Sequence, residues 1–147
     1  MPVTIRPLTT ADRSDWEALF TAYAEFYGVP QTPQMRETVW GWLHDPDHGS
    51  TCLVAEHDGK VIGLTHFRPF VSTLRAITNG FLDDLFVDPA ARGTGAAQAL
   101  IDAVSAHGRA RGWGTIRWIT ADDNYRARGV YDRLATRTGW ITYDIKL

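Results

Sequence analysis

A short loop with two glycines, Arg92–Ala97, constrains the fold of this chain more than any other stretch of its sequence. Upstream, the strand-like residues Phe81–Val87 end at the turn signal Asp88-Pro89, and downstream the apolar residues of Gln98–Val104 recur at helical spacing. Backbone N–H groups at a helix start lack intrahelical partners, and glycine permits close approach of the backbone, so this arrangement can hold a phosphate group. The same pattern is also typical of a tight strand–helix turn, and the loop alone does not separate the two interpretations.

This sequence lacks features of two common phosphate-binding motifs, and their absence limits which phosphate ligands the loop can bind. A Gly-Lys-Ser/Thr sequence does not follow the loop, so the P-loop of nucleoside triphosphatases is excluded. A dinucleotide fingerprint belongs on the first strand of its sheet, whereas this loop begins at residue 92 of 147. We therefore expect the loop to bind a diphosphate on a different fold.

Composition excludes several classes of protein. At 147 residues the sequence predicts one domain over residues 1–147, and a hydrophobic content of 44% with six tryptophans supports a packed core. A net charge of −2 gives no reason to expect nucleic acid or a membrane as partner. No apolar run approaches about 18 residues, and the histidines lack metal-site spacing. The sequence predicts a cytoplasmic protein without a resident metal, in which Cys52 is a buried, unreactive thiol.

Hydrophobic periodicity and turn signals predict the order of the elements. We expect strands at Val3–Arg6, Thr51–Glu56, Val61–Phe67, Phe81–Val87, Thr115–Thr120 and Trp140–Leu147, and helices at 10–27, 32–43, 95–109 and 124–134. Residues 68–78 are expected to form a loop or an irregular strand, and Asp58-Gly59 predicts a tight hairpin. The order β-α-α-β-β-β-α-β-α-β indicates an α/β (α+β) fold, with a mixed sheet of about six strands and helices on both faces.

Two residue patterns lie on the loop and on a later helix, namely Arg/Gln-x-x-Gly-x-Gly/Ala and an Asn followed by Ala and Tyr. The matching residues are Arg92, Gly95 and Ala97 for the first, and Asn124, Ala127 and Tyr131 for the second. At this separation the chain resembles the GNAT superfamily of acyl-CoA N-acyltransferases over nearly its whole length. It looks most like the branch with yeast histone- and polyamine-acetylating enzymes and small bacterial relatives. The resemblance implies the GNAT fold and direct transfer of acetyl from acetyl-CoA to a primary amine.

The resemblance also implies where the cosubstrate acetyl-CoA binds. The loop amides are expected to hold the coenzyme A pyrophosphate, the preceding strand to pair with the pantetheine arm, and Asn124 to bond this arm from the following helix. The expected binding residues are Leu85, Phe86, Val87, Arg92, Gly93, Thr94, Gly95, Ala96, Ala97, Asn124 and Ala127. A bulge near the loop is expected to splay the strand from its neighbour and make room for the thioester.

The catalytic groups are implied in the same way. Tyr131 is expected to be the general acid at the departing thiolate, and Asp83 and Asp84 are the candidates for the base that takes the amine proton. Because adjacent strand residues face opposite sides, we expect at most one aspartate to point into a given pocket, and we favour Asp83. A solvated or structural role is the alternative for both. Ala135 and Thr136 stand where many members have Gly-Phe, which puts family-based inferences about the acceptor pocket in doubt.

The acidic residues around the expected reaction centre favour a cationic acceptor, such as a polyamine, an amino sugar or a lysine side chain. A catalytically degenerate acyl-CoA-binding sensor or partner domain is the alternative, and the combination of Tyr131 with an acidic strand pair argues against it. Relatives in the similar branch pair or exchange their last segment between subunits. The strand expected at Trp140–Leu147 would otherwise end as a sheet edge, so we expect a homodimer. The alternative is that this strand packs within its own subunit.

Overall fold

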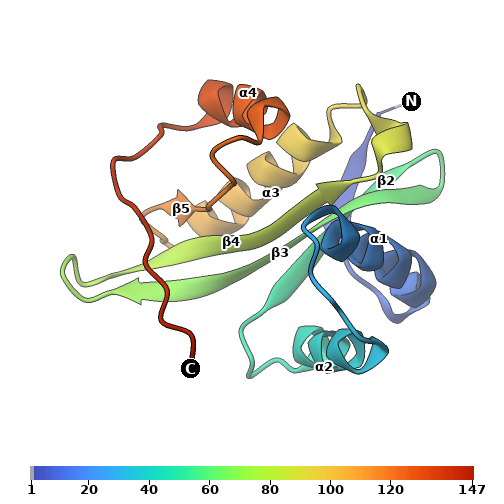
Figure 1. The fold of residues 1–147 in the computed structure, drawn as a ribbon, viewed down its shortest axis with the longest axis horizontal. Helices are drawn as coiled ribbons and strands as arrows, with labels where there is room; N and C mark the ends of the chain where they lie inside the picture. Colours follow the sequence, from blue (N-terminus) through green and yellow to red (C-terminus); the bar gives the residue numbers. More distant parts are fainter. Residues whose placement is uncertain (1) are drawn as a thin grey trace.

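The computed structural model describes residues 2–147 and contains a five-stranded sheet in the order β1-β2-β3-β4-β5, with helices on both faces (Figure 1). The strands are β1 (Thr4–Pro7), β2 (Thr51–His57), β3 (Lys60–Ser72), β4 (Ile77–Val87) and β5 (Ile116–Arg117). The helices are α1 (Arg13–Phe26), α2 (Pro33–His44), α3 (Ala96–Ala110) and α4 (Tyr125–Leu134), with short 3-10 helices η1 (Thr10–Asp12) and η2 (Pro89–Ala91). Strands β1 to β4 pair antiparallel, and β5 pairs with β4 in parallel. The expected α+β fold with a mixed sheet is confirmed.

Local sequence signals explain where several elements begin and turn. Thr32 caps α2 by accepting the Met35 N–H at 3.2 Å, and Pro33 takes the first helical position, where a missing N–H costs nothing. Asp58 and Gly59 have φ values of 51° and 74°, as the tight turn between β2 and β3 requires. The predicted hairpin is therefore confirmed.

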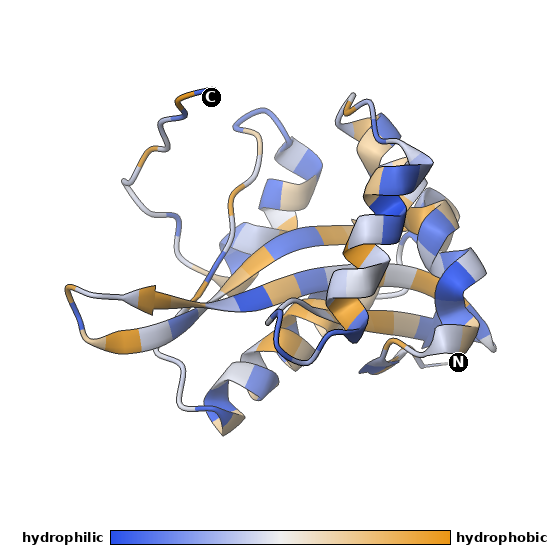
Figure 2. Ribbon diagram, turned by 90° about the horizontal axis from the view of Figure 1, so that it is seen from below, coloured by the Kyte–Doolittle hydropathy of each residue, from blue (hydrophilic) through white to orange (hydrophobic). Residues whose placement is uncertain are grey.

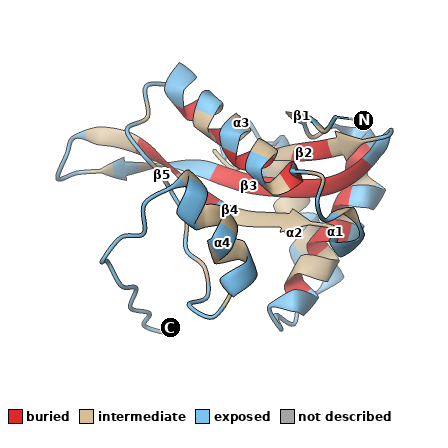
Figure 3. Cartoon of the chain, turned by 90° about the horizontal axis from the view of Figure 1, so that it is seen from above, coloured by how far each residue is buried: buried red, intermediate tan, exposed pale blue. Residues whose placement is uncertain are grey.

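Two hydrophobic layers enclose the sheet, one under α1 and α2 and the other under α3 and α4. On the first face, Trp16 of α1 packs in a cluster with Leu64 of β3. On the second face, Ile101 and Val104 of α3 pack with Phe67 of β3. Figure 3 shows the buried residues concentrated in β2, β3 and the inner sides of α1 and α3. The middle of the sheet is thus covered on both faces, whereas most residues of Phe81–Val87 in β4 are only partly buried.

Strands β3 and β4 form a longer hairpin than the sequence predicts. Of the two expectations for the stretch 68–78, a loop or an irregular strand, the second is confirmed, because β3 continues to Ser72, β4 begins at Ile77 and only a short turn separates them. Cross-strand aromatic contacts explain the extension, because the Phe70 and Phe81 rings lie 6.0 Å apart and the Arg68 guanidinium lies 5.0 Å from the Phe81 ring.

The C-terminal segment, residues 135–147, lies apart from the sheet (Figures 2 and 3). The prediction of a sixth strand at Trp140–Leu147 is wrong here, because within residues 2–147 the sheet ends at β5. The alternating apolar side chains are exposed, with Trp140 at 83% and Ile145 at 88%. Figure 2 shows hydrophobic residues at intervals along this segment. The pattern of a strand is present, but β5 is only two residues long and offers it little edge to pair with.

Candidate active site

Strands β4 and β5 separate beside the glycine loop. They pair only at Gly80 and Phe81 of β4, although the sequence predicts a strand over residues 115–120. From Leu82 to Val87, β4 pairs with β3 on one side, and its other edge has no strand partner in the described part of the chain. An extended ligand with amide groups can pair with such an edge as an added strand. Strand β4 thus separates from β5 as expected, but the bulge that β4 contains lies in its pairing with β3.

The loop after β4 combines two left-handed glycines with a helix start. Gly93 and Gly95 have φ values of 85° and 79°, and a Cβ at either position would meet no atom within 4 Å. Gly95, which has no side chain, is the N-cap of α3, and its carbonyl accepts the Ala99 N–H at 3.0 Å. The backbone N–H groups of Ala96–Gln98 lie in the first turn of α3, where N–H groups have no acceptor within the helix. An anion at this point gains both hydrogen bonds and the favourable helix dipole.

A β-bulge places Asp83 and Asp84 on the same face of the sheet. The β3–β4 register shifts between His66 and Phe67, which leaves Asp83 as the extra residue. The His66 Nδ1 lies 2.8 Å from Asp84 Oδ2, and the Arg68 Nε lies 3.1 Å from Asp83 Oδ2. His66 and Arg68 are two residues apart in β3 and face the same side. The expectation that the two aspartates face opposite sides is therefore wrong, and both lie on the α1 side.

The two carboxylates have different surroundings. Arg68 approaches both oxygens of Asp83, at 3.2 and 3.1 Å, while burial raises the pKa of Asp83 despite this cation. Asp84 lies against the buried His66, and Tyr23 of α1 is close by. Burial, and then the charge of Asp84, raise the pKa of Tyr23. The pair therefore consists of one carboxylate bound by a guanidinium and one that contacts a buried imidazole and lies near a tyrosine.

Tyr131 reaches this region from α4. Its ring packs edge-on against Trp118 with centroids 5.3 Å apart, and burial followed by the nearby Tyr27 raises its pKa to about 12. A phenol with this pKa keeps its proton at neutral pH and can donate it. At the start of the same helix, Asn124 Oδ1 accepts the Ala127 N–H at 3.4 Å, a cap that does not use the Asn124 side-chain N–H groups.

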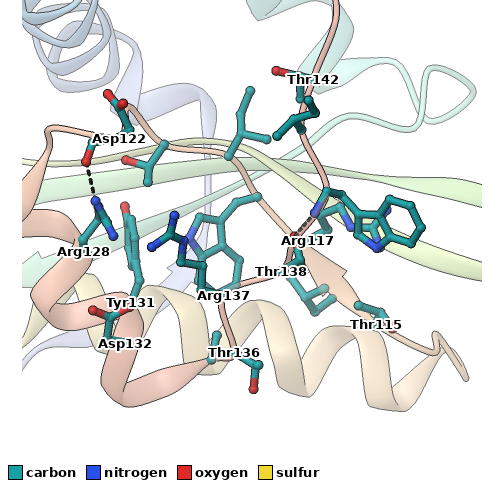
Figure 4. Close-up of a pocket in the computed structure, with 18 of the residues that line it drawn as sticks. Thr115, Arg117, Asp122, Arg128, Tyr131, Asp132, Thr136, Arg137, Thr138 and Thr142 are labelled. Atoms are coloured by element: carbon teal, nitrogen blue, oxygen red, sulfur yellow. Dashed lines mark hydrogen bonds between the residues drawn. The ribbon is translucent and has the colours of Figure 1, made fainter.

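A cavity of about 1090 Å³ borders the site between β5, α4 and the C-terminal segment (Figure 4). Phe81 and Tyr131 line it, but neither aspartate does. Near Tyr131, the Arg128 guanidinium donates to the Asp122 carbonyl oxygen (Figure 4). Because residues 136–142 form part of its wall, the size of this cavity depends on the position of the C-terminal segment. The open edge of β4 is the better candidate for the chemistry, because Asp84 and Tyr131 both lie near Tyr23, whose pKa is raised first by burial and then also by each of them.

Sequence reasoning missed two residues that shape the site. The sequence predicts no role in the site for either His66 or Trp16. The register of β3 with β4, which the bulge shifts, is what brings His66 to Asp84, and neither periodicity nor motif spacing encodes that shift. Cys52 is buried, and burial raises the pKa of its thiol, as expected of an unreactive core cysteine.

Two wider properties concern the described residues as a whole. Within residues 2–147 no helix combines the length and apolarity needed to cross a bilayer. The same residues hold no group of three or more His, Cys, Asp and Glu side chains arranged to bind a metal ion.

Comparisons with known proteins agree with this architecture. A model of the acetyltransferase (GNAT) family matches residues 16–135. The chain is 31% identical over 141 residues to the uncharacterized N-acetyltransferase YhfO of Bacillus subtilis, covering 95% of this chain and 94% of that protein. It is 24% identical over 144 residues to the D-amino-acid N-acetyltransferase HPA3 of Saccharomyces cerevisiae, covering 96% and 89% respectively. A crystal structure of a ribosomal-protein-alanine N-acetyltransferase from Brucella melitensis superposes with a TM-score of 0.83 at 23% identity, over 100% of both chains, and supports the fold.

Proposed function

Because this chain belongs to the GNAT family of acetyltransferases, we propose that it transfers acetyl from acetyl-CoA to a primary amine in the gap between β4 and β5. The observation that carries this proposal is the open edge of β4, Leu82–Val87, which leads directly into the glycine loop. A ligand that pairs with the edge and continues to the loop must have an extended amide-bearing part followed by an anionic part. Acetyl-CoA has both in that order, and the family implies it as cosubstrate.

The residues present fit acetyl-CoA. Leu85, Phe86 and Val87 would pair with the pantetheine arm, since the β5 side of this stretch has no strand partner within residues 2–147. The loop Arg92–Ala97 would hold the pyrophosphate, because a Cβ at Gly93 or Gly95 would point into the open space that a ligand needs. Asn124 and Ala127 would flank the arm from the start of α4. Bound there, acetyl-CoA supplies an activated thioester.

The amine must lose a proton before it attacks, and the departing thiolate must be stabilised. The acidic pair Asp83 and Asp84 supplies the base, and the Tyr131 hydroxyl supplies the acid. Direct transfer, without an acetyl-enzyme on cysteine, is supported by Cys52, because this residue is 4% exposed and its burial raises the pKa of the thiol.

The acceptor that we propose is cationic, such as a polyamine, an amino sugar or a lysine side chain, because two carboxylates share the α1 side of the gap. A second class, amino acids, is favoured by Arg68, whose guanidinium beside Asp83 could bind a carboxylate. The name of the yeast relative HPA3 specifies a D-amino-acid substrate, which gives a reason to test both enantiomers.

We also propose that the protein, one acetyltransferase domain over residues 1–147, acts as a homodimer in the cytoplasm. The exposed C-terminal segment supports a dimer, because four apolar side chains at alternate positions lack cover in the described part of the chain. These residues are Ile141, Tyr143, Ile145 and Leu147. A strand of this kind gains cover when it pairs with a second copy.

The proposal is tested by incubating the protein with acetyl-CoA and a panel of polyamines, amino sugars, lysine peptides and L- and D-amino acids. Mass spectrometry of the products and measurement of the released thiol should show at least one acetylated amine. Tight acetyl-CoA binding with no acetylated product across the panel would instead support an acyl-CoA-binding sensor or partner domain.

A further inference from the structure

A buried chain of hydrogen bonds runs from α1 to the acidic pair. The Trp16 Nε1 donates to His66 Nε2 at 3.0 Å, and the His66 Nδ1 lies 2.8 Å from Asp84 Oδ2. Trp16 is 0% exposed and His66 is 5% exposed, so water does not compete for the bond between them. The three residues come from α1, β3 and β4, and the fold, not local sequence, brings them together.

The indole at one end sets the proton positions along the chain. An indole N–H is a donor only, so His66 Nε2 must accept, and the single proton of the imidazole lies on Nδ1. That N–H therefore donates to Asp84. The Phe20 ring packs against the imidazole at 4.9 Å between centroids, nearly perpendicular, and hinders rotation of the ring. The imidazole is thus held in one orientation and one tautomer.

Asp83 is held in a different way. The Arg68 Nε lies near both of its oxygens, at 3.2 and 3.1 Å, so a cation already occupies the carboxylate. The bond from His66 reaches Asp84 through Oδ2 alone, and the Asp84 side chain is 24% exposed. An incoming ammonium group would therefore compete with Arg68 for Asp83. At Asp84 it would compete with no guanidinium of residues 2–147.

We propose that Trp16 and His66 are positioning residues that fix Asp84 as the general base for the acceptor amine. This inference rests on the proposed acetyl transfer, and it replaces the earlier preference for Asp83. One proton leaves the acceptor ammonium as its N–H bond breaks, and an O–H bond forms on Asp84. The proton does not pass on to His66, because Nδ1 already carries one and Nε2 is bonded to Trp16. Asp84 later returns its proton to water, so the chain orients the carboxylate and does not conduct protons.

The first test requires no turnover. Long-range ¹H–¹⁵N correlation spectra of the wild-type protein near neutral pH should show His66 as the Nδ1–H tautomer, and His66→Asn identifies the signal by its loss. Trp16→Phe should release Nε2 and give exchange between tautomers. Phe20→Leu is the matched control, because it disturbs packing on the same imidazole but leaves the hydrogen bond from Trp16. An Nε2–H tautomer or tautomer exchange in the wild-type protein would overturn the proposal.

The second test uses an amine that the wild-type protein acetylates. Asparagine can donate an N–H to Asp84 and leucine cannot, so His66→Leu should lower kcat about tenfold or more while His66→Asn retains most of it. The KM for acetyl-CoA should be nearly unchanged in both. Asp84→Asn should lose more kcat than Asp83→Asn. Equal losses in the two His66 variants, or a larger loss at Asp83, would overturn the inference. Failure of the wild-type protein to acetylate any amine would instead count against the proposed function, while the tautomer result stands on its own.

Discussion

A substitution at Gly95 is expected to affect coenzyme binding more than it affects folding. It has a φ of 79° and is the N-cap of α3, and a Cβ added there would meet no atom within 4 Å. Valine at this position therefore causes no collision in the folded protein. Its cost to folding is the strain of the left-handed backbone, about 1–2 kcal/mol for a residue with a Cβ and more for a β-branched one.

The cost to binding has a different origin. If the backbone relaxes toward negative φ, the N–H groups of Ala96–Gln98 turn away from the direction in which the loop presents them. A hydrogen bond to a charged group contributes about 1.5–3 kcal/mol, so misaligning one such bond to the pyrophosphate weakens binding about tenfold or more. We therefore expect Gly95→Val to raise the Kd for acetyl-CoA at least about tenfold, with a melting temperature lower by about 2–8 °C.

Calorimetric titration with acetyl-CoA and thermal unfolding check both parts. Gly112→Val is the matched control, because Gly112 has a similar φ of 72° with equally open space, at the opposite end of α3. It should lower the melting temperature to a similar extent without changing the Kd. A folded Gly95→Val protein with wild-type affinity would refute the assignment of the loop to the pyrophosphate.

Three further predictions concern the acid, the pH dependence of stability and the dimer. Tyr131→Phe should lower kcat about 10²-fold with little change in acetyl-CoA affinity. Tyr125→Phe, at an exposed position on the same helix, should leave kcat unchanged. A near-normal kcat in Tyr131→Phe would show that water or another group is the acid. Arg6 lowers the pKa of Asp12 from 3.8 to about 2. This ion pair therefore stabilises the protein fully at pH values above the pKa of Asp12 in the unfolded chain, and its contribution is lost as the pH falls through about 2. Chemical unfolding of Asp12→Asn at several pH values should lack this loss, and a pH profile like that of the wild-type protein would contradict the prediction. Light scattering at micromolar concentration should give about twice the chain mass of 16.4 kDa, and removal of residues 140–147 should give a monomer. A monomeric full-length chain would contradict the proposed dimer.

The parts of the fold that could be predicted from sequence are those encoded locally. The helix that begins at Asn124, the hairpin at Asp58-Gly59 and the strand–loop–helix around Gly95 each depend on a few adjacent residues with strong conformational preferences. Their types and approximate positions follow from those preferences. The glycine loop in particular was recognisable because positive φ at Gly93 and Gly95 requires that residue type.

The parts that could not be predicted depend on long-range register. The bulge at Asp83 shifts one strand against another by a residue, and this reverses the conclusion that the two aspartates face opposite sides. The last strand was predicted from a correct alternation of apolar residues, but a strand also needs a partner. The short pairing of β5 leaves the segment after residue 139 without one in residues 2–147. Local pattern specifies neither register nor partner.

The most direct test of acetyl transfer at this site follows a ¹³C-labelled acetyl group from acetyl-CoA in a single turnover with the best acceptor of the panel. The account predicts that the label appears on the amine nitrogen in equal amount to the released coenzyme A thiol, and that the mass of the protein stays constant. Label that remains on acetyl-CoA with every amine, or that accumulates on the protein, would contradict direct transfer between β4 and β5.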